Sequence, residues 1–192
     1  MMEINETYNE KETITIVKEI YKQNPKVPSA TLQQFFTEYS YKRLQKEVIN
    51  TKKEVRIDYL HHKYKECPGP KELESFLNKK EFIKLLHKIT GKTYNKISLK
   101  SFVLSWKDYS LIHDKHIEKP GLDIIIDLTE SWDYKDGGAV IYVDGTGDYA
   151  PVISERNSLT IVKRTPTVRK FIKYINNRAK GKERTLLIGT AV

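Results

Sequence analysis

The spacing of apolar positions changes once along this chain, close to Gly91. Upstream, apolar residues recur every three or four positions, as in residues 73–77 and 82–89. That is the period of a helix with one buried face. Downstream, apolar and polar residues alternate in short runs, which is the period of a half-buried strand. The pattern therefore predicts a mainly helical part over residues 11–91 and a β part over residues 96–192, behind a disordered tail at residues 1–10.

The helical part is interrupted at several points. We expect a first helix over residues 12–23, which Pro25 and Pro28 end, and a second helix that Ser29 caps and whose apolar face runs over residues 32–48. Residues 53–59 alternate and are expected to form a strand. Gly91 suits the position that follows the last turn of a helix.

The β part contains short segments rich in β-branched and aromatic residues, at 97–106, 109–112, 122–128, 139–143, 159–162, 168–175 and 185–192. Turn sequences such as Asp-Gly-Gly and Lys-Gly-Lys separate them, and no helical pattern lies between them. This spacing favours antiparallel closure over βαβ units. We predict an α+β fold, with a C-terminal antiparallel barrel or jelly roll and N-terminal helices packed outside it, as a single domain over residues 11–192.

Composition limits the class of protein. No apolar run approaches the roughly 20 residues that cross a bilayer, and the N-terminus lacks the features of a secretory signal. The single cysteine, Cys67, excludes an internal disulfide, so we expect a cytoplasmic protein. The net charge of +9 makes nucleic acid a possible partner, but the lysines are spread along the whole chain.

Several residues of the β part stand in a suggestive order. His113 follows an aromatic strand, the stretch Thr-Glu-Ser-Trp-Asp ends a later one, and three further positions follow at Gly137-Gly138, Asn157 and Arg184. In this order, residues from about 70 to 192 resemble the prolyl-hydroxylase-like branch of the Fe(II)- and 2-oxoglutarate-dependent oxygenases. The resemblance implies a double-stranded β-helix that uses Fe(II) and 2-oxoglutarate to hydroxylate a protein side chain or a small molecule. It also implies that Arg184, in the final strand, binds a carboxylate of 2-oxoglutarate.

The chain departs from the metal pattern of that family, which is His-x-Asp followed by a distal histidine near the start of the penultimate strand. Lys115 stands where the carboxylate is expected, and the distal position falls on or beside Arg169. Protonated lysine and arginine offer no lone pair to a metal ion. In addition, the tyrosine that helps to hold 2-oxoglutarate in the family would fall at Asp127.

Three interpretations of residues 113–118 remain open. In the first, an iron site is rebuilt locally from His113, Asp114 and His116. On a regular strand Asp114 and His116 share one face and His113 lies on the other, so a bulge or turn would be needed to bring all three together. In the second, the barrel has lost its metal and is a catalytically inactive module that binds nucleic acid or a protein partner. In the third, the segment is a solvated strand end.

Two further features have competing interpretations. Arg184 either faces inward and grips a carboxylate or borders the turn before it and faces water. His61 and His62 could be metal ligands, but no third ligand stands beside them, so we assign them structural or surface roles.

Overall fold

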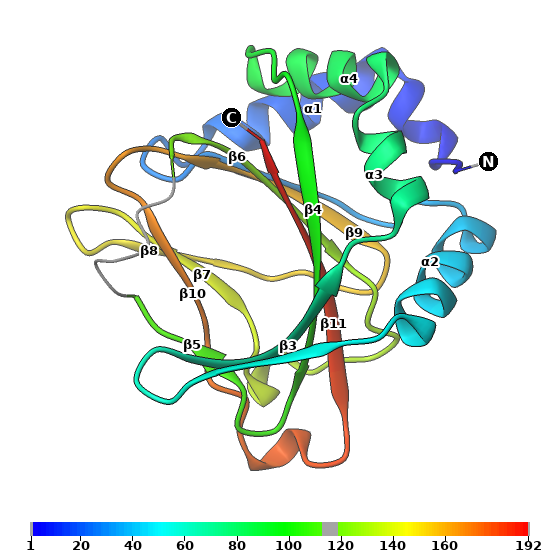
Figure 1. Cartoon of the computed structure of the whole chain (residues 1–192). Helices are drawn as coiled ribbons and strands as arrows, with labels where there is room; N and C mark the ends of the chain where they lie inside the picture. The colour runs from blue at the N-terminus through cyan, green and yellow to red at the C-terminus, as the bar shows by residue number, and fades with distance from the viewer. Residues whose placement is uncertain (1, 113–118, 192) are drawn as a thin grey trace.

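The computed structural model of the protein describes residues 2–112 and 119–191, which form two antiparallel β-sheets and a layer of helices. Figure 1 shows α1 and α4 lying side by side and α2 and α3 following them around the same side of the sheets. The helices are α1 (Lys11–Lys22), α2 (Glu38–Asn50), α3 (Lys71–Leu77) and α4 (Lys80–Thr90), with short 3-10 helices η1 (Glu6–Asn9), η2 (Tyr134–Asp136) and η3 (Asn177–Ala179). Among residues 2–112 and 119–191, no helix has the length and hydrophobicity that crossing a membrane requires.

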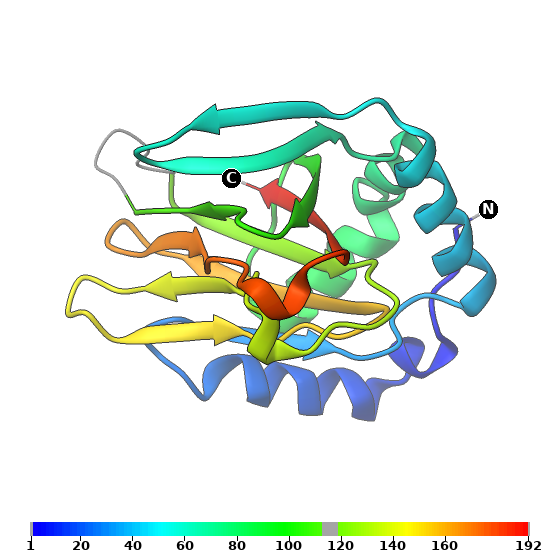
Figure 2. The same cartoon turned by 90° about the horizontal axis from the view of Figure 1, so that it is seen from below.

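The major sheet has the strand order β1-β9-β6-β11-β4-β3-β2, and β5 pairs with β3. These strands are β1 (Ser29–Leu32), β2 (Glu54–Asp58), β3 (His62–Pro68), β4 (Ile97–Ser105), β5 (Tyr109–Ser110), β6 (Gly121–Asp127), β9 (Ser158–Arg164) and β11 (Glu183–Ala191). The minor sheet has the order β10-β7-β8, formed by β7 (Val140–Val143), β8 (Tyr149–Val152) and β10 (Arg169–Ile172). Figure 2 shows the minor sheet facing the major one, as in a jelly roll. The predicted α+β fold class is therefore confirmed.

The central strand β6 shows why the major sheet carries apolar residues on both faces. Ile124 and Ile126 belong to the hydrophobic cluster under the helices, whereas Ile125 belongs to the cluster between the two sheets. A strand covered on both sides loses the alternation of polar and apolar positions. This explains the unbroken run Ile-Ile-Ile in the sequence.

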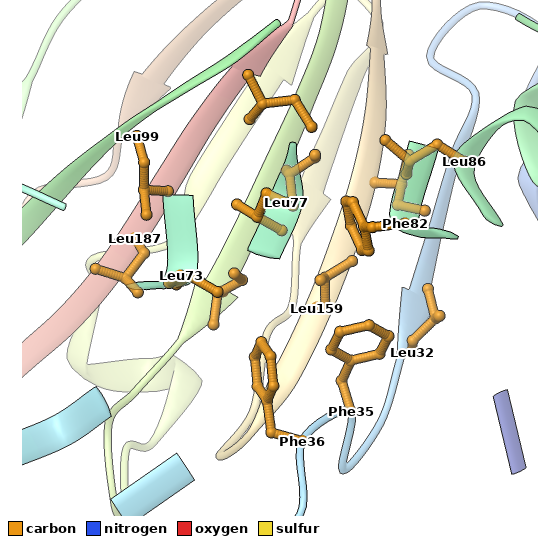
Figure 3. Close-up of a cluster of buried hydrophobic side chains, with 14 of the residues drawn as sticks. Leu32, Phe35, Phe36, Leu73, Leu77, Phe82, Leu86, Leu99, Leu159 and Leu187 are labelled. Atoms are coloured by element: carbon orange, nitrogen blue, oxygen red, sulfur yellow. The ribbon is translucent and has the colours of Figure 1, made fainter. Parts of the chain in front are cut away.

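The helical layer is held to the outer face of the major sheet by large apolar side chains. Figure 3 shows Phe35, Phe36 and Phe82 packed against strand residues such as Leu159, together with leucines of α3 and α4. The Phe35 ring contacts the rings of Phe36 and Phe82 in edge-on arrangements, with centroids 4.9 and 6.2 Å apart. One continuous cluster therefore joins the helical part to the barrel.

Several sequence expectations need correction. Residues 29–32 form strand β1 and not the start of a helix, because they pair with β9, and α2 begins only at Glu38. Strands β1, β2 and β3 all lie in the part expected to be mainly helical. Residues 2–10 do not match the expected disordered tail, since Met2 is buried and the Asn5 amide donates to the Phe35 carbonyl. The strand expected at residues 53–59 is confirmed as β2, and Gly91 ends α4 in the left-handed conformation.

Candidate functional site at the barrel mouth

A cavity of about 540 Å³ lies between the two sheets at one end of the barrel. Apolar side chains of both sheets form part of its walls, with Phe102 and Ile188 from the major sheet and Val140 and Ile172 from the minor sheet. Three aliphatic hydroxyl groups, those of Ser98, Ser110 and Thr190, also line it, as do charged residues such as Lys100 and Arg169. This volume, and the presence of both apolar and polar groups around it, are typical of small-molecule sites.

Three polar side chains beside this cavity bind the same residue, Asp123, whose carboxylate on β6 is fully buried. The Tyr142 hydroxyl donates to Asp123 Oδ2 at 2.7 Å, and Lys170 Nζ donates to the same oxygen at 2.9 Å. Arg164 Nε forms an ion pair with Asp123 Oδ1 at 3.0 Å, and Arg164 Nη2 donates to the Ala191 carbonyl. Asp123 and Arg164 belong to the major sheet and Tyr142 and Lys170 to the minor sheet. We call this set of four residues the mouth cluster; it ties the two sheets together.

Two cations of the mouth cluster, Arg164 and Lys170, both contact the carboxylate of Asp123. Both cations line the cavity together with Tyr142, whereas Asp123 is fully buried. Another cation that lines the cavity, Lys100, pairs through Nζ with Glu66 Oε2 at 3.3 Å.

A second ionic group lies at the opposite end of the barrel. Arg184, which is 2% exposed, donates from Nη2 to Asp127 Oδ2 at 2.7 Å and to Ser154 Oγ at 2.8 Å. Asp127 follows Asp123 by four residues along β6, a separation of about 13 Å. Arg184 therefore faces inward, as one of the two sequence interpretations holds, and its partner in this structure is a carboxylate of the protein itself.

The other residues that carried the family resemblance surround the same end. Trp132 Nε1 donates to the Gly137 carbonyl at 2.9 Å, and the Arg184 guanidinium lies 5.8 Å from the centroid of the Trp132 ring. Asn157 has a positive φ of 57°, and its side-chain amide bonds both the amide and the carbonyl of Phe36. These contacts hold loops in place at this end of the barrel. Trp132 and Asn157, which carried the family resemblance, therefore have structural roles here.

The predicted iron ligands His113, Asp114 and His116 lie outside the described residues. Arg169 is the first residue of β10, the penultimate strand, and Lys170 follows it. Arg169 Nη1 donates to the carbonyls of Pro166 and Val168, and neither residue can bind a metal ion while protonated. Within residues 2–112 and 119–191, no three His, Cys, Asp or Glu side chains are grouped so that they could hold a metal ion. The described residues alone thus do not fit an iron site, and such a site would depend on residues 113–118.

His61 and His62 are nearer to the site than the sequence indicated. Both line the cavity, and His62 pairs in register with Ser110 of β5. The His62 ring stacks on Tyr64 at 5.0 Å, and burial raises the pKa of the Tyr64 hydroxyl. A signal for this placement exists in the sequence, since His62, Tyr64 and Glu66 alternate and so share one face of β3.

Comparison with known proteins agrees with this architecture. Residues 60–185, about two thirds of the chain, match the family model described as oxoglutarate and iron-dependent oxygenase degradation C-term. The chain belongs to this family. No curated protein sequence matches it.

Solved structures of 2-oxoglutarate- and Fe(II)-dependent oxygenases share the fold of this family member. A 2OG-Fe(II) oxygenase family oxidoreductase from Burkholderia pseudomallei superposes with a TM-score of 0.72 at 10% identity, covering 93% of this chain and 90% of that one. A prolyl-4-hydroxylase from Pseudomonas putida gives 0.66 at 13% identity, with 93% and 97% coverage. A prolyl hydroxylase from Trichoplax adhaerens, in complex with a hypoxia inducible factor peptide fragment, gives 0.70 at 10% identity, with 96% and 94% coverage.

These comparisons confirm the resemblance to the prolyl-hydroxylase-like oxygenases and the jelly-roll architecture. Fe(II) and 2-oxoglutarate are the cofactors of the family and of its structural neighbours, which supports the expectation of an enzyme of this class.

Proposed function

We propose that this family member is a 2-oxoglutarate-dependent non-haem iron oxygenase that hydroxylates a protein side chain or a small molecule. The observation that carries the proposal is the cavity between the sheets, which Arg164 and Lys170 line together with apolar side chains of both sheets. Ile112 lines this cavity, and His113 is the next residue in the sequence. The cavity can accept a small anionic co-substrate near Ile112, which directly precedes the candidate ligands in the sequence.

Iron in this proposal would be held by His113 with Asp114 or His116, and it would supply the activation of O₂. No described residue completes that ligand set. The part that the described residues play is to bind and orient an anion and to exclude water with the walls of the cavity.

The test is turnover of 2-oxoglutarate by purified protein that has been reconstituted anaerobically with Fe(II) and then exposed to O₂. We expect succinate to form, and we expect His113→Ala to abolish both its formation and retention of the metal. His87→Ala is the matched control, since His87 lies on α4, away from the cavity. The absence of succinate and of bound 2-oxoglutarate with wild-type protein would overturn the proposal.

A second candidate is a catalytically inactive jelly-roll module that binds nucleic acid or a protein partner. One observation favours it, namely that Arg169 and Lys170 occupy the start of the penultimate strand. For this candidate we expect no metal in the purified protein and an association with nucleic acid that weakens as salt is added. Retention of iron would count against it.

Substrate class and location belong to the same proposal. The Trichoplax neighbour binds a peptide fragment, which supports a protein side chain as one class of substrate. Cys67 is buried, with 4% exposure, and carries a free thiol, which supports a reducing, cytoplasmic location.

A further inference from the structure

We propose that two copies of this chain associate through strand β2, in an antiparallel pairing whose two-fold axis passes between the two copies of Val55. Such a pairing would join the two major sheets into one continuous sheet. The inference goes beyond the proposed function and does not depend on it.

Strand β2 is the last strand of the major sheet, and all of its residues are exposed. It pairs with β3 and, within residues 2–112 and 119–191, with no other strand. Figure 2 shows it as the outermost strand, in cyan at the top of the view. An edge strand presents a row of backbone amide and carbonyl groups that another strand can bind. β2 therefore offers a hydrogen-bonding edge over its whole length.

Two other edges of the sheets are protected in ways that β2 is not. β1, at the far end of the major sheet, is a short strand in which buried residues alternate with half-buried ones. β8, at an edge of the minor sheet, contains Pro151, which has no amide hydrogen to donate. β2 contains no proline, and it carries Val55 and Ile57, which are 59% and 46% exposed. Pairing of this edge would bury apolar surface as well as satisfy backbone groups.

The two faces of β2 differ in character. Arg56 pairs in register with Tyr64, which lines the cavity, so the charged residues of β2 lie on the cavity face of the hairpin. Val55 and Ile57 lie on the opposite face. Residues that pair across antiparallel strands point to the same face of the sheet. A symmetric pairing of β2 with itself therefore has to be centred on one residue of the strand.

Charge complementarity selects that residue. A pairing centred on Val55 sets Glu54 of each copy opposite Arg56 of the other, and Lys52 opposite Asp58. A pairing centred on Arg56 instead sets Arg56 opposite itself and Glu54 opposite Asp58, so that every charged pair is of like sign. The sequence of the strand thus favours the first register and opposes the second.

A pairing centred on Ile57 would also bring opposite charges together, since it sets Arg56 opposite Asp58. However, the hairpin turn begins at Tyr59, and the His61 amide donates back to the Asp58 carbonyl at 2.8 Å. The chain beyond Asp58 turns away from the edge, so this register uses only part of β2. The register centred on Val55 uses all of it.

The contacts of Arg56 within one copy are compatible with the pairing. Its guanidinium binds Glu54 Oε2 at 2.9 Å and Glu66 Oε1 at 2.8 Å, and half of the side-chain surface stays exposed. A guanidinium group has five N–H donors, so Arg56 can bind Glu54 of the second copy while it keeps its contact with Glu66.

The first experiment is cysteine cross-linking of the full chain under mild oxidation. In this register the two Val55 Cα atoms lie about 5 Å apart, and the two Ile57 Cα atoms lie about 14 Å apart. A disulfide needs Cα atoms within about 7 Å of each other. We expect Val55→Cys to form a disulfide-linked dimer. Ile57→Cys is the matched control on the same face and should stay unlinked, as should wild-type protein, whose Cys67 is buried.

The second experiment measures association by sedimentation equilibrium. We expect wild-type protein to dimerise reversibly. Glu54→Arg sets like charges opposite each other at two symmetric places, so it should raise the dissociation constant about tenfold, and Arg56→Glu should do the same. The double variant with both substitutions restores opposite charges across the pairing and should dimerise as the wild type does.

Three outcomes would overturn the inference: wild-type protein that sediments as a monomer at every concentration, equal cross-linking of Val55→Cys and Ile57→Cys, or single charge variants that associate as the wild type does. The succinate assay is independent of all three. Succinate formation by a monomeric protein would leave the proposed function standing and remove only this inference, and a β2 dimer that forms no succinate would do the reverse.

Discussion

Arg184 and Asp127 bind each other inside the barrel, with Arg184 Nη2 donating to Asp127 Oδ2 at 2.7 Å. Both residues stand at positions that the family resemblance associates with 2-oxoglutarate. Where the family has a tyrosine this chain has an aspartate, and that aspartate balances the charge of the arginine. Asp127, which departs from the family pattern, and Arg184, which matches it, are therefore partners in one ion pair.

The first prediction concerns this buried pair. Asp127→Asn leaves the Arg184 charge without a counter-ion, so we expect a loss of about 3 kcal/mol in the free energy of unfolding. The double variant Asp127→Leu with Arg184→Met replaces the pair by apolar side chains and should recover most of that loss. Urea denaturation measures both, and a double variant no more stable than Asp127→Asn would show that charge is not the cause.

The second prediction concerns Gly137, whose φ is 92° and where an added Cβ would lie 2.1 Å from the Tyr174 carbonyl oxygen. Gly147 is a matched control, because its φ is 88° and an added Cβ would meet no atom within 4 Å. We expect Gly147→Ala to cost about 1–2 kcal/mol for backbone strain. Gly137→Ala should cost clearly more, since the Tyr174 backbone must also move. Equal shifts of the thermal midpoint for the two variants would contradict this account.

The third prediction concerns stability in acid. A hydrogen bond from Lys182, with further help from Arg178, holds the pKa of Asp136 below its ordinary value. A lowered pKa in the folded state stabilises the protein above the pKa of the unfolded chain, and this stabilisation is lost as the pH falls below about 4. We therefore expect Asp136→Asn to make the unfolding free energy less dependent on pH in that range. Asp133→Asn, at a more exposed carboxylate, should change the slope less, and a wild-type slope in Asp136→Asn would refute the prediction.

The fourth prediction uses the thiol of Cys67, which is 4% exposed on β3. A thiol without solvent access reacts with a disulfide reagent only when the surrounding structure opens. We expect modification of the native protein to be slower than that of the urea-unfolded chain by a factor of at least about 100, and to follow the unfolding transition. Rapid labelling in native buffer would mean that this end of β3 opens locally.

The sequence predicted the β part well, because apolar and polar residues alternate along most of its strands. The missed strand was β8, which contains Pro151; it lies at the edge of the minor sheet, where a residue without an amide hydrogen is tolerated. The error at Ser29 had another cause. The apolar spacing of residues 32–36 suits a helix, but pairing with β9 decides the conformation of residues 29–32, and pairing is a long-range interaction.

The candidate site was harder to predict for the same reason. Asp123, Tyr142, Arg164 and Lys170 come from four strands, and no local pattern marks them as a group. The sequence offered an inward-facing Arg184 as one of two interpretations, yet it could not show that Asp127 would be its partner. Its use as the anchor for 2-oxoglutarate stays a prediction, and so do the ligand roles of His113, Asp114 and His116.

The pairing of β1 with β9 has a consequence for how this protein can be divided. The family match begins at residue 60 and ends at residue 185, so it leaves out β1 and β2 and cuts β11 after its third residue. A fragment with those limits would expose the edge of β9 and uncover the outer face of the major sheet, which α1 and α2 help to cover. We infer that the boundaries of the shared sequence are not those of an independently folding unit: a chimera or truncation that keeps the β9 edge paired and the outer face covered has to carry residues from α1 through the end of β11.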